Sequence, residues 1–109
     1  KRGTLVKEGQ AQKEVMLILD GTASVRRNGR EIAELGRGSF VAEMSFLTGE
    51  PASADVVCKH EITTITWGQE NLRNLKKLNF EVWIKVQHVL SKDLVGKIKR
   101  TTMRLHQEV

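Results

Sequence analysis

The sequence has 109 residues, of which 39% are hydrophobic and 28% charged, a composition typical of one globular domain. The single cysteine, Cys58, excludes an intrachain disulfide, and no apolar run approaches the roughly 18 residues of a membrane span. These features favour a cytoplasmic protein, with a membrane tether upstream of Lys1 left open. The net charge of +5 lies entirely from Gln69 onward, where nine basic residues face four acidic ones, whereas the first 68 residues carry nine of each. This asymmetry predicts two functionally different parts of the chain.

Short apolar segments alternate with glycine-containing turns in the first 68 residues. They predict strands at 4–6, 15–19, 22–26, 31–35, 54–58 and 62–67. Asn28-Gly29 is the strongest hairpin signal, and the continuous apolar run at 15–19 predicts a strand that is buried on both faces. Strands and turns at this spacing predict a sandwich or small barrel of the jelly-roll kind.

The stretch 36–57 differs from the segments around it. It reads as a glycine-marked turn, one short helical turn with Glu43 at its start, a Gly49-Glu50-Pro51 turn, and a strand that opens on small residues. Such a loop presents free backbone N–H groups and a hydroxyl beside one carboxylate. It is therefore predicted to bind an anionic, sugar-bearing ligand.

Helical patterns begin after Gly68. We expect a helix over 69–78, a break and helix cap at Asn79, and a long helix over 80–105. The apolar stripe of the long helix consists of Trp83, Val86, Leu90, Leu94, Ile98 and Leu105, widened by Val82 and Val89. Its first half can pack on the β domain, and its second half is predicted to meet a partner helix in a homodimer.

The order of these features resembles the cyclic nucleotide-binding domain family. The resemblance rests on Glu8-Gly9, Asp20-Gly21, Asn28-Gly29, Gly36-Arg37-Gly38, the stretch from Phe40 to Val56, and the two helices that follow. It implies a mainly β fold with α elements: a jelly-roll-like β-roll, or double-stranded β-helix, followed by two C-terminal helices of which the last is long. In this scheme 1–68 forms the β-roll with the phosphate-binding cassette at 36–57, and 69–109 forms a helical lid and dimerisation helix of the same domain.

The resemblance also assigns roles within the cassette. Ala42 stands at the family's glycine, Glu43 at the glutamate that accepts from the ribose 2′-hydroxyl, and Ser53 at a residue that reaches the cyclic phosphate. Met44 belongs to the short helix whose backbone N–H groups meet that phosphate, and Ala52 stands where the family has its phosphate-binding arginine. The implied ligand-binding residues are therefore Ala42, Glu43, Met44, Ala52 and Ser53.

Ala52 is the departure from the family pattern. An arginine–phosphate hydrogen bond contributes about 1.5–3 kcal/mol, so its absence lowers affinity about tenfold to a hundredfold. Strand alternation is expected to place Asp55 on the same face as Ser53, which would add a negative charge nearby. The arginines that can substitute from neighbouring turns are Arg26, Arg27, Arg30 and Arg37.

These observations predict a noncatalytic sensor or regulatory module, with no catalytic residue, metal site or cofactor, that binds cAMP, cGMP or a related anionic ligand and relays binding through its C-terminal helices. The alternative is a degenerate domain that no longer binds nucleotide and acts as a dimerisation or interaction module.

The basic segment 97–100 with Arg104 is expected to be a solvated helix face. A third, weaker hypothesis is that this segment contacts nucleic acid. The sequence contains no DNA-reading element.

Overall fold

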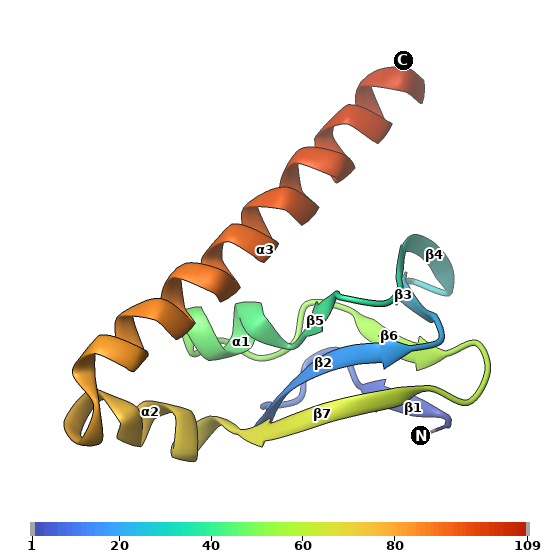
Figure 1. Ribbon diagram of the computed structural model, residues 1–109. Helices are drawn as coiled ribbons and strands as arrows, with labels where there is room; N and C mark the ends of the chain where they lie inside the picture. The colour runs from blue at the N-terminus through green and yellow to red at the C-terminus, as the bar shows by residue number, and fades with distance from the viewer. Residues whose placement is uncertain (1, 109) are drawn as a thin grey trace.

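The computed structural model describes the backbone of residues 2–108 and the side chains of residues 2–99. Within these residues the strands form two antiparallel sheets, ordered β1-β6-β3-β4 and β5-β2-β7, and the long last helix leaves them at an angle (Figure 1). The strands are β1 (Thr4–Val6), β2 (Glu14–Asp20), β3 (Ala23–Arg27), β4 (Arg30–Leu35), β5 (Phe40–Val41), β6 (Asp55–Cys58) and β7 (Thr63–Gly68). The helices are α1 (Glu43–Thr48), α2 (Gln69–Leu78) and α3 (Phe80–Glu108). The predicted β-roll with two C-terminal helices is confirmed.

The hairpin between β3 and β4 turns at Asn28-Gly29, as predicted. Both residues have positive φ, 54° and 74°, which is the backbone of a type I′ turn. The turn pairs Arg27 with Arg30 and so fixes where the side chains at the end of β3 lie.

The core lies between the two sheets. Its buried residues are Val6, Met16, Ile18, Ala23, Leu35, Val41, Val56 and Ile62. The expectation that 15–19 is buried on both faces is wrong at its end, because Leu19 is 40% exposed. Successive side chains of a strand point to opposite faces, so Leu19 lies on the face opposite the fully buried Ile18.

A second cluster joins the helices to the roll. Its buried residues are Val15, Phe46, Leu72, Trp83 and Leu90, and the Phe46 and Trp83 rings pack edge to face at 5.9 Å. Asn79 separates α2 from α3 and caps α3, since its side chain accepts a hydrogen bond from the Val82 N–H at 3.2 Å. Val82 and Val89 are exposed and do not widen the buried stripe as expected, because at 100° per residue they lie about 80–100° around the helix from the buried Leu90.

The course of α3 positions the functional region. The helix first packs on α1 and α2, and its C-terminal part then rises away from the two sheets (Figure 1). Leu105 lies outside the residues whose side chains are described. None of the helices in the described part combines the length and hydropathy that a bilayer crossing requires.

Candidate functional site: a cavity between the cassette and the last helix

The cassette forms the turn, short helix and strand that the sequence predicts. β5 pairs with β2, and Ala42 then turns the chain into α1 with φ 69° and ψ 17°. This left-handed conformation is unfavourable for a residue with a Cβ and natural for glycine, the residue that the family pattern has here. Gly49, with φ 76°, closes α1 at its other end. Ala42 thus adopts a left-handed turn at the position where the family pattern has glycine.

A cavity of about 480 Å³ lies against this cassette. Residues from β3, β4, the cassette, β6 and α3 line it, with Val25, Ile32, Leu35 and Leu94 among its apolar walls. All the residues predicted to bind ligand lie on its surface, namely Ala42, Glu43, Met44, Ala52 and Ser53. The structure therefore brings them together, and their role in binding stays a prediction.

Glu43 is the buried carboxylate of the cavity. Its side chain is 4% exposed and pairs with the ammonium group of Lys97 from α3. Burial raises the pKa of Glu43 above its ordinary value, since desolvation outweighs the opposing effect of the Lys97 charge. A buried, partnered carboxylate of this kind can accept a hydrogen bond from a ligand hydroxyl, provided that the ligand competes with or joins Lys97.

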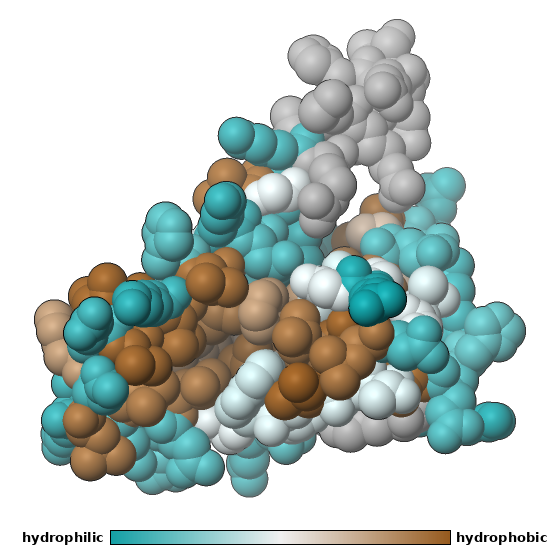
Figure 2. Space-filling view, in the orientation of Figure 1, coloured by the Kyte–Doolittle hydropathy of each residue, from teal (hydrophilic) through white to brown (hydrophobic). Residues whose placement is uncertain are grey.

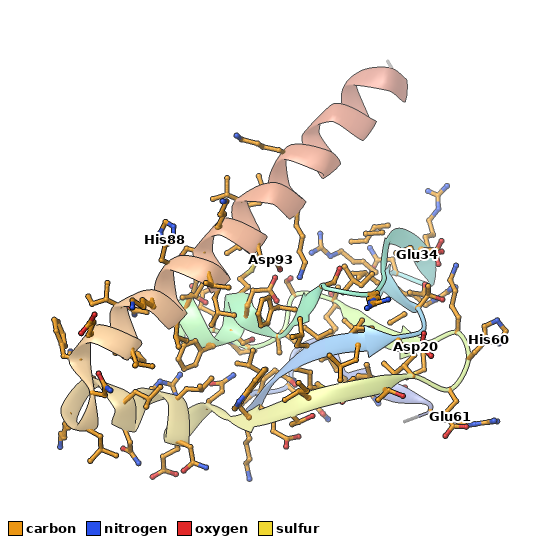
Figure 3. All side chains as sticks on the ribbon, in the orientation of Figure 1. Asp20, Glu34, His60, Glu61, His88 and Asp93 are labelled. Carbon is orange, nitrogen blue, oxygen red and sulfur yellow. The ribbon has the colours of Figure 1, made fainter. Side chains whose placement is uncertain are left out.

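Lys97 is the cavity residue whose position sequence reasoning missed. It was expected on a solvated basic face, but its side chain is only 19% exposed, and the ammonium also donates to the Phe40 carbonyl oxygen and lies 3.0 Å from Asp93 Oδ2. Figure 3 shows Asp93 on the side of α3 that faces α1 and β5, whereas His88 points away. One signal was present in the sequence: Lys97 follows Leu94 by three residues and directly precedes Ile98, so it borders the apolar stripe.

The opposite part of the cavity contains Arg27, Ala52 and Ser53. Arg27 Nε donates a hydrogen bond to the Ser53 carbonyl oxygen at 3.0 Å. Asp55 was expected to share a face with Ser53, but its carboxylate accepts the Glu8 N–H at 2.7 Å and does not line the cavity. The alternation argument failed because Ser53 precedes the first residue of β6 and has no strand backbone.

The cavity thus combines a carboxylate near α3, a guanidinium near the Ala52–Ser53 turn, and apolar walls between them. Such an arrangement suits a ligand with hydroxyl groups, a flat apolar part and an anionic group. A separate hydrophobic area lies outside the cavity, where α1, α2 and the start of α3 meet, with hydrophilic residues around it (Figure 2).

Comparison with known proteins supports the architecture. A sequence profile described as "Cyclic nucleotide-binding domain" matches residues 1–79. The chain is 34% identical over 79 residues to a cGMP-dependent protein kinase of Plasmodium berghei (strain Anka), covering 72% of this chain and 9% of the kinase. It is 31% identical over 91 residues to a cGMP-dependent protein kinase of Toxoplasma gondii, covering 84% of this chain and 8% of the kinase.

A solved structure shows the same fold. The crystal structure of a cyclic nucleotide-binding domain from Methylobacillus flagellatus superposes with a TM-score of 0.91 at 24% identity, over 100% of this chain and 64% of that one. The chain spans less than a tenth of the length of the two kinases. The similarity to them therefore concerns one domain of each kinase.

Proposed function

The chain belongs to the cyclic nucleotide-binding domain family, and from this premise we propose that it is a noncatalytic sensor module. In this proposal a cyclic nucleotide, or a related anionic ligand with a sugar, binds the cassette and changes the position of α3. The observation that carries the proposal is the ion pair between Glu43 and Lys97 inside the cavity. It joins the expected ligand-binding carboxylate directly to the helix that would transmit the signal.

The ion pair supplies a physical route for the relay. A ribose hydroxyl that donates to Glu43 approaches the same carboxylate that holds Lys97, so binding weakens the contact between α3 and the cassette. A ligand shifts the position of a helix only as far as it favours one arrangement over the other. Here the difference is that Glu43 is bonded to Lys97 in one arrangement and to the ligand in the other.

Isothermal titration with cAMP and with cGMP tests the proposal. We expect binding by the wild-type chain and tighter binding by Ala52→Arg, since that change restores the family's phosphate contact. Amide hydrogen exchange along α3 should rise around Lys97 when ligand is present. Absence of heat at millimolar ligand in both the wild type and Ala52→Arg would refute nucleotide sensing.

The second candidate is a dimerisation or interaction module that has lost nucleotide binding. It is favoured by Ala52 and by an exposed apolar face on α3. Phe80, Ile84, Val95 and Ile98 are all exposed, and at 100° per residue they fall within about 60° of one another around the helix. In a monomer, that face would remain in water.

Sedimentation analysis distinguishes this candidate. Val95→Glu should dissociate a homodimer formed through this face, whereas Val89→Glu, on the opposite side of α3, should not. Val89→Glu is a matched control for Val95→Glu because both valines are 50% exposed. A wild-type chain that stays monomeric at high concentration would refute self-association.

A further inference from the structure

The cassette lacks a cation at Ala52, yet a guanidinium lies against the same turn. We propose that Arg27 of β3 supplies the positive charge for the ligand's anionic group, which binds at the corner formed by Arg27 and Ser53. The inference rests on the proposed function, since it names the anion contact of the same cavity.

The backbone holds Arg27 in this position. The residue ends β3 directly before the Asn28-Gly29 turn, and its Nε donates to the carbonyl oxygen of Ser53, the residue after Ala52. The nearest carboxylate oxygen, Glu8 Oε1, lies 4.0 Å from Nε, and both side chains are about half exposed, so this pair is weak. Arginine has donors on three nitrogens, and only Nε has a hydrogen-bond partner among the described residues.

Ser53 supplies further donors beside the guanidinium. In the described part of the chain its hydroxyl and its backbone N–H have no hydrogen-bond partner, and Ser53 lines the cavity. Apart from Glu8, two further acidic groups are held by other partners. Asp55 accepts the Glu8 N–H, and Glu34, which does line the cavity, has Lys59 Nζ 2.5 Å from Oε2. The corner therefore presents donors and one charge of the sign that an anion requires.

Arg27 is better placed than the other cations. Lys97 also lines the cavity, but Glu43, Asp93 and the Phe40 carbonyl oxygen surround its ammonium. Arg26 donates through Nη2 to the Gly29 carbonyl oxygen and does not line the cavity. The structure thus selects one arginine from those that the sequence left open.

Titration of cAMP into a set of variants tests the inference. Arg27→Gln should weaken binding about tenfold to a hundredfold, the loss expected for a charge-assisted hydrogen bond. Arg26→Gln, the adjacent arginine on the same hairpin, should bind as the wild type does. Adding Ala52→Arg to Arg27→Gln should restore affinity, because the charge returns to the same corner. Equal affinity of the wild type and Arg27→Gln for cAMP would overturn the inference. Binding of cAMP by the Ala52→Arg variant, with no binding by the wild type, would overturn it as well.

A second experiment separates this inference from nucleotide sensing. Inorganic phosphate is titrated into the wild-type chain labelled with ¹⁵N, and the NMR signals of Arg27 Nε–H and the Ser53 amide are followed. We expect both to shift at millimolar phosphate. In Arg27→Gln, which has no Nε–H at this position, the Ser53 amide should not shift. If phosphate shifts them while cAMP and cGMP do not bind, Arg27 is an anion site and nucleotide sensing fails. If phosphate shifts neither signal in the wild type, Arg27 does not bind the anion.

Discussion

Replacing Lys97 by methionine removes the cation that pairs with Glu43 while keeping a long apolar side chain. Glu43, whose side chain is 4% exposed, then loses its charged partner. Breaking one side of a buried ion pair costs about 3–5 kcal/mol, because the remaining charge is left in a poorly solvated site. We expect the lower end, about 3 kcal/mol, since the Lys97 side chain is 19% exposed and Glu43 can take up a proton.

A double-mutant cycle isolates the ion pair from the packing of the two side chains. Glu43→Gln removes the buried charge together with the attraction, so we expect its free energy of unfolding to change by about 1 kcal/mol or less. Lys97→Met should then cost less in the Glu43→Gln background than in the wild type, since only the Lys97 contacts with Asp93 and the Phe40 carbonyl oxygen are lost there. The expected coupling energy is about 2–3 kcal/mol, a large share of the roughly 5–15 kcal/mol that stabilises a domain.

Urea denaturation measures each free energy of unfolding, with Lys85→Met as the matched control. Lys85 pairs with Glu81 on the same helix at 3.6 Å, but both side chains are exposed. That variant should stay within about 0.5 kcal/mol of the wild type. Equal destabilisation by Lys97→Met in the wild-type and Glu43→Gln backgrounds would refute the ion pair as the contact that holds α3 on the cassette.

Three further changes test the geometry. Ala42→Gly should raise the free energy of unfolding, measured in urea, by about 0.5 kcal/mol. The reason is that relief of the positive-φ strain slightly exceeds the entropy that glycine adds to the unfolded chain. A lower free energy of unfolding in this variant would contradict the strain. Gly21→Ala should cost about 3 kcal/mol, since φ is 94° and the new Cβ would lie 2.7 Å from Ile62 Cγ2. Gly29→Ala also has a positive φ but open space around it, and should cost about 1 kcal/mol in the same assay. Equal losses in the two variants would exclude the clash. The raised pKa of Glu43 means that its contribution to stability is full below the unfolded-state pKa and is lost as pH rises through the folded-state value. The stability of the wild type relative to Glu43→Gln should therefore fall with rising pH in urea titrations, and a rise would show that attraction to Lys97 outweighs burial.

Local signals in the sequence predicted most of the fold. Asn28-Gly29 fixed a hairpin, Asn79 separated the two helices, and the glycine-marked turns bounded the strands. These signals predicted the elements correctly because each depends on the backbone preference of one or two residues. The cassette could be predicted for the same reason, since its turn, short helix and strand lie within one continuous stretch.

The charge partners of the cavity could not be predicted in this way. Lys97 and Glu43 lie 54 positions apart, and their contact depends on the angle at which α3 leaves Asn79. Four arginines were equivalent in the sequence, and the register of the β3–β4 hairpin decided that Arg27 reaches the cavity. Both contacts depend on tertiary geometry, which residue patterns and spacing in the sequence do not encode.

The two cations of the cavity imply opposite effects on ligand affinity. Arg27 presents its charge to the ligand, so removing it should weaken binding, whereas Lys97 occupies the carboxylate that the ligand needs. If a ribose hydroxyl displaces Lys97, the free energy of the ion pair is subtracted from the free energy of binding. Lys97→Met should therefore be less stable than the wild type and yet bind cAMP more tightly, by about 30-fold to 150-fold for a coupling of about 2–3 kcal/mol. Weaker binding by Lys97→Met in isothermal titration would instead make Lys97 a direct contact of the ligand and contradict its role in releasing α3.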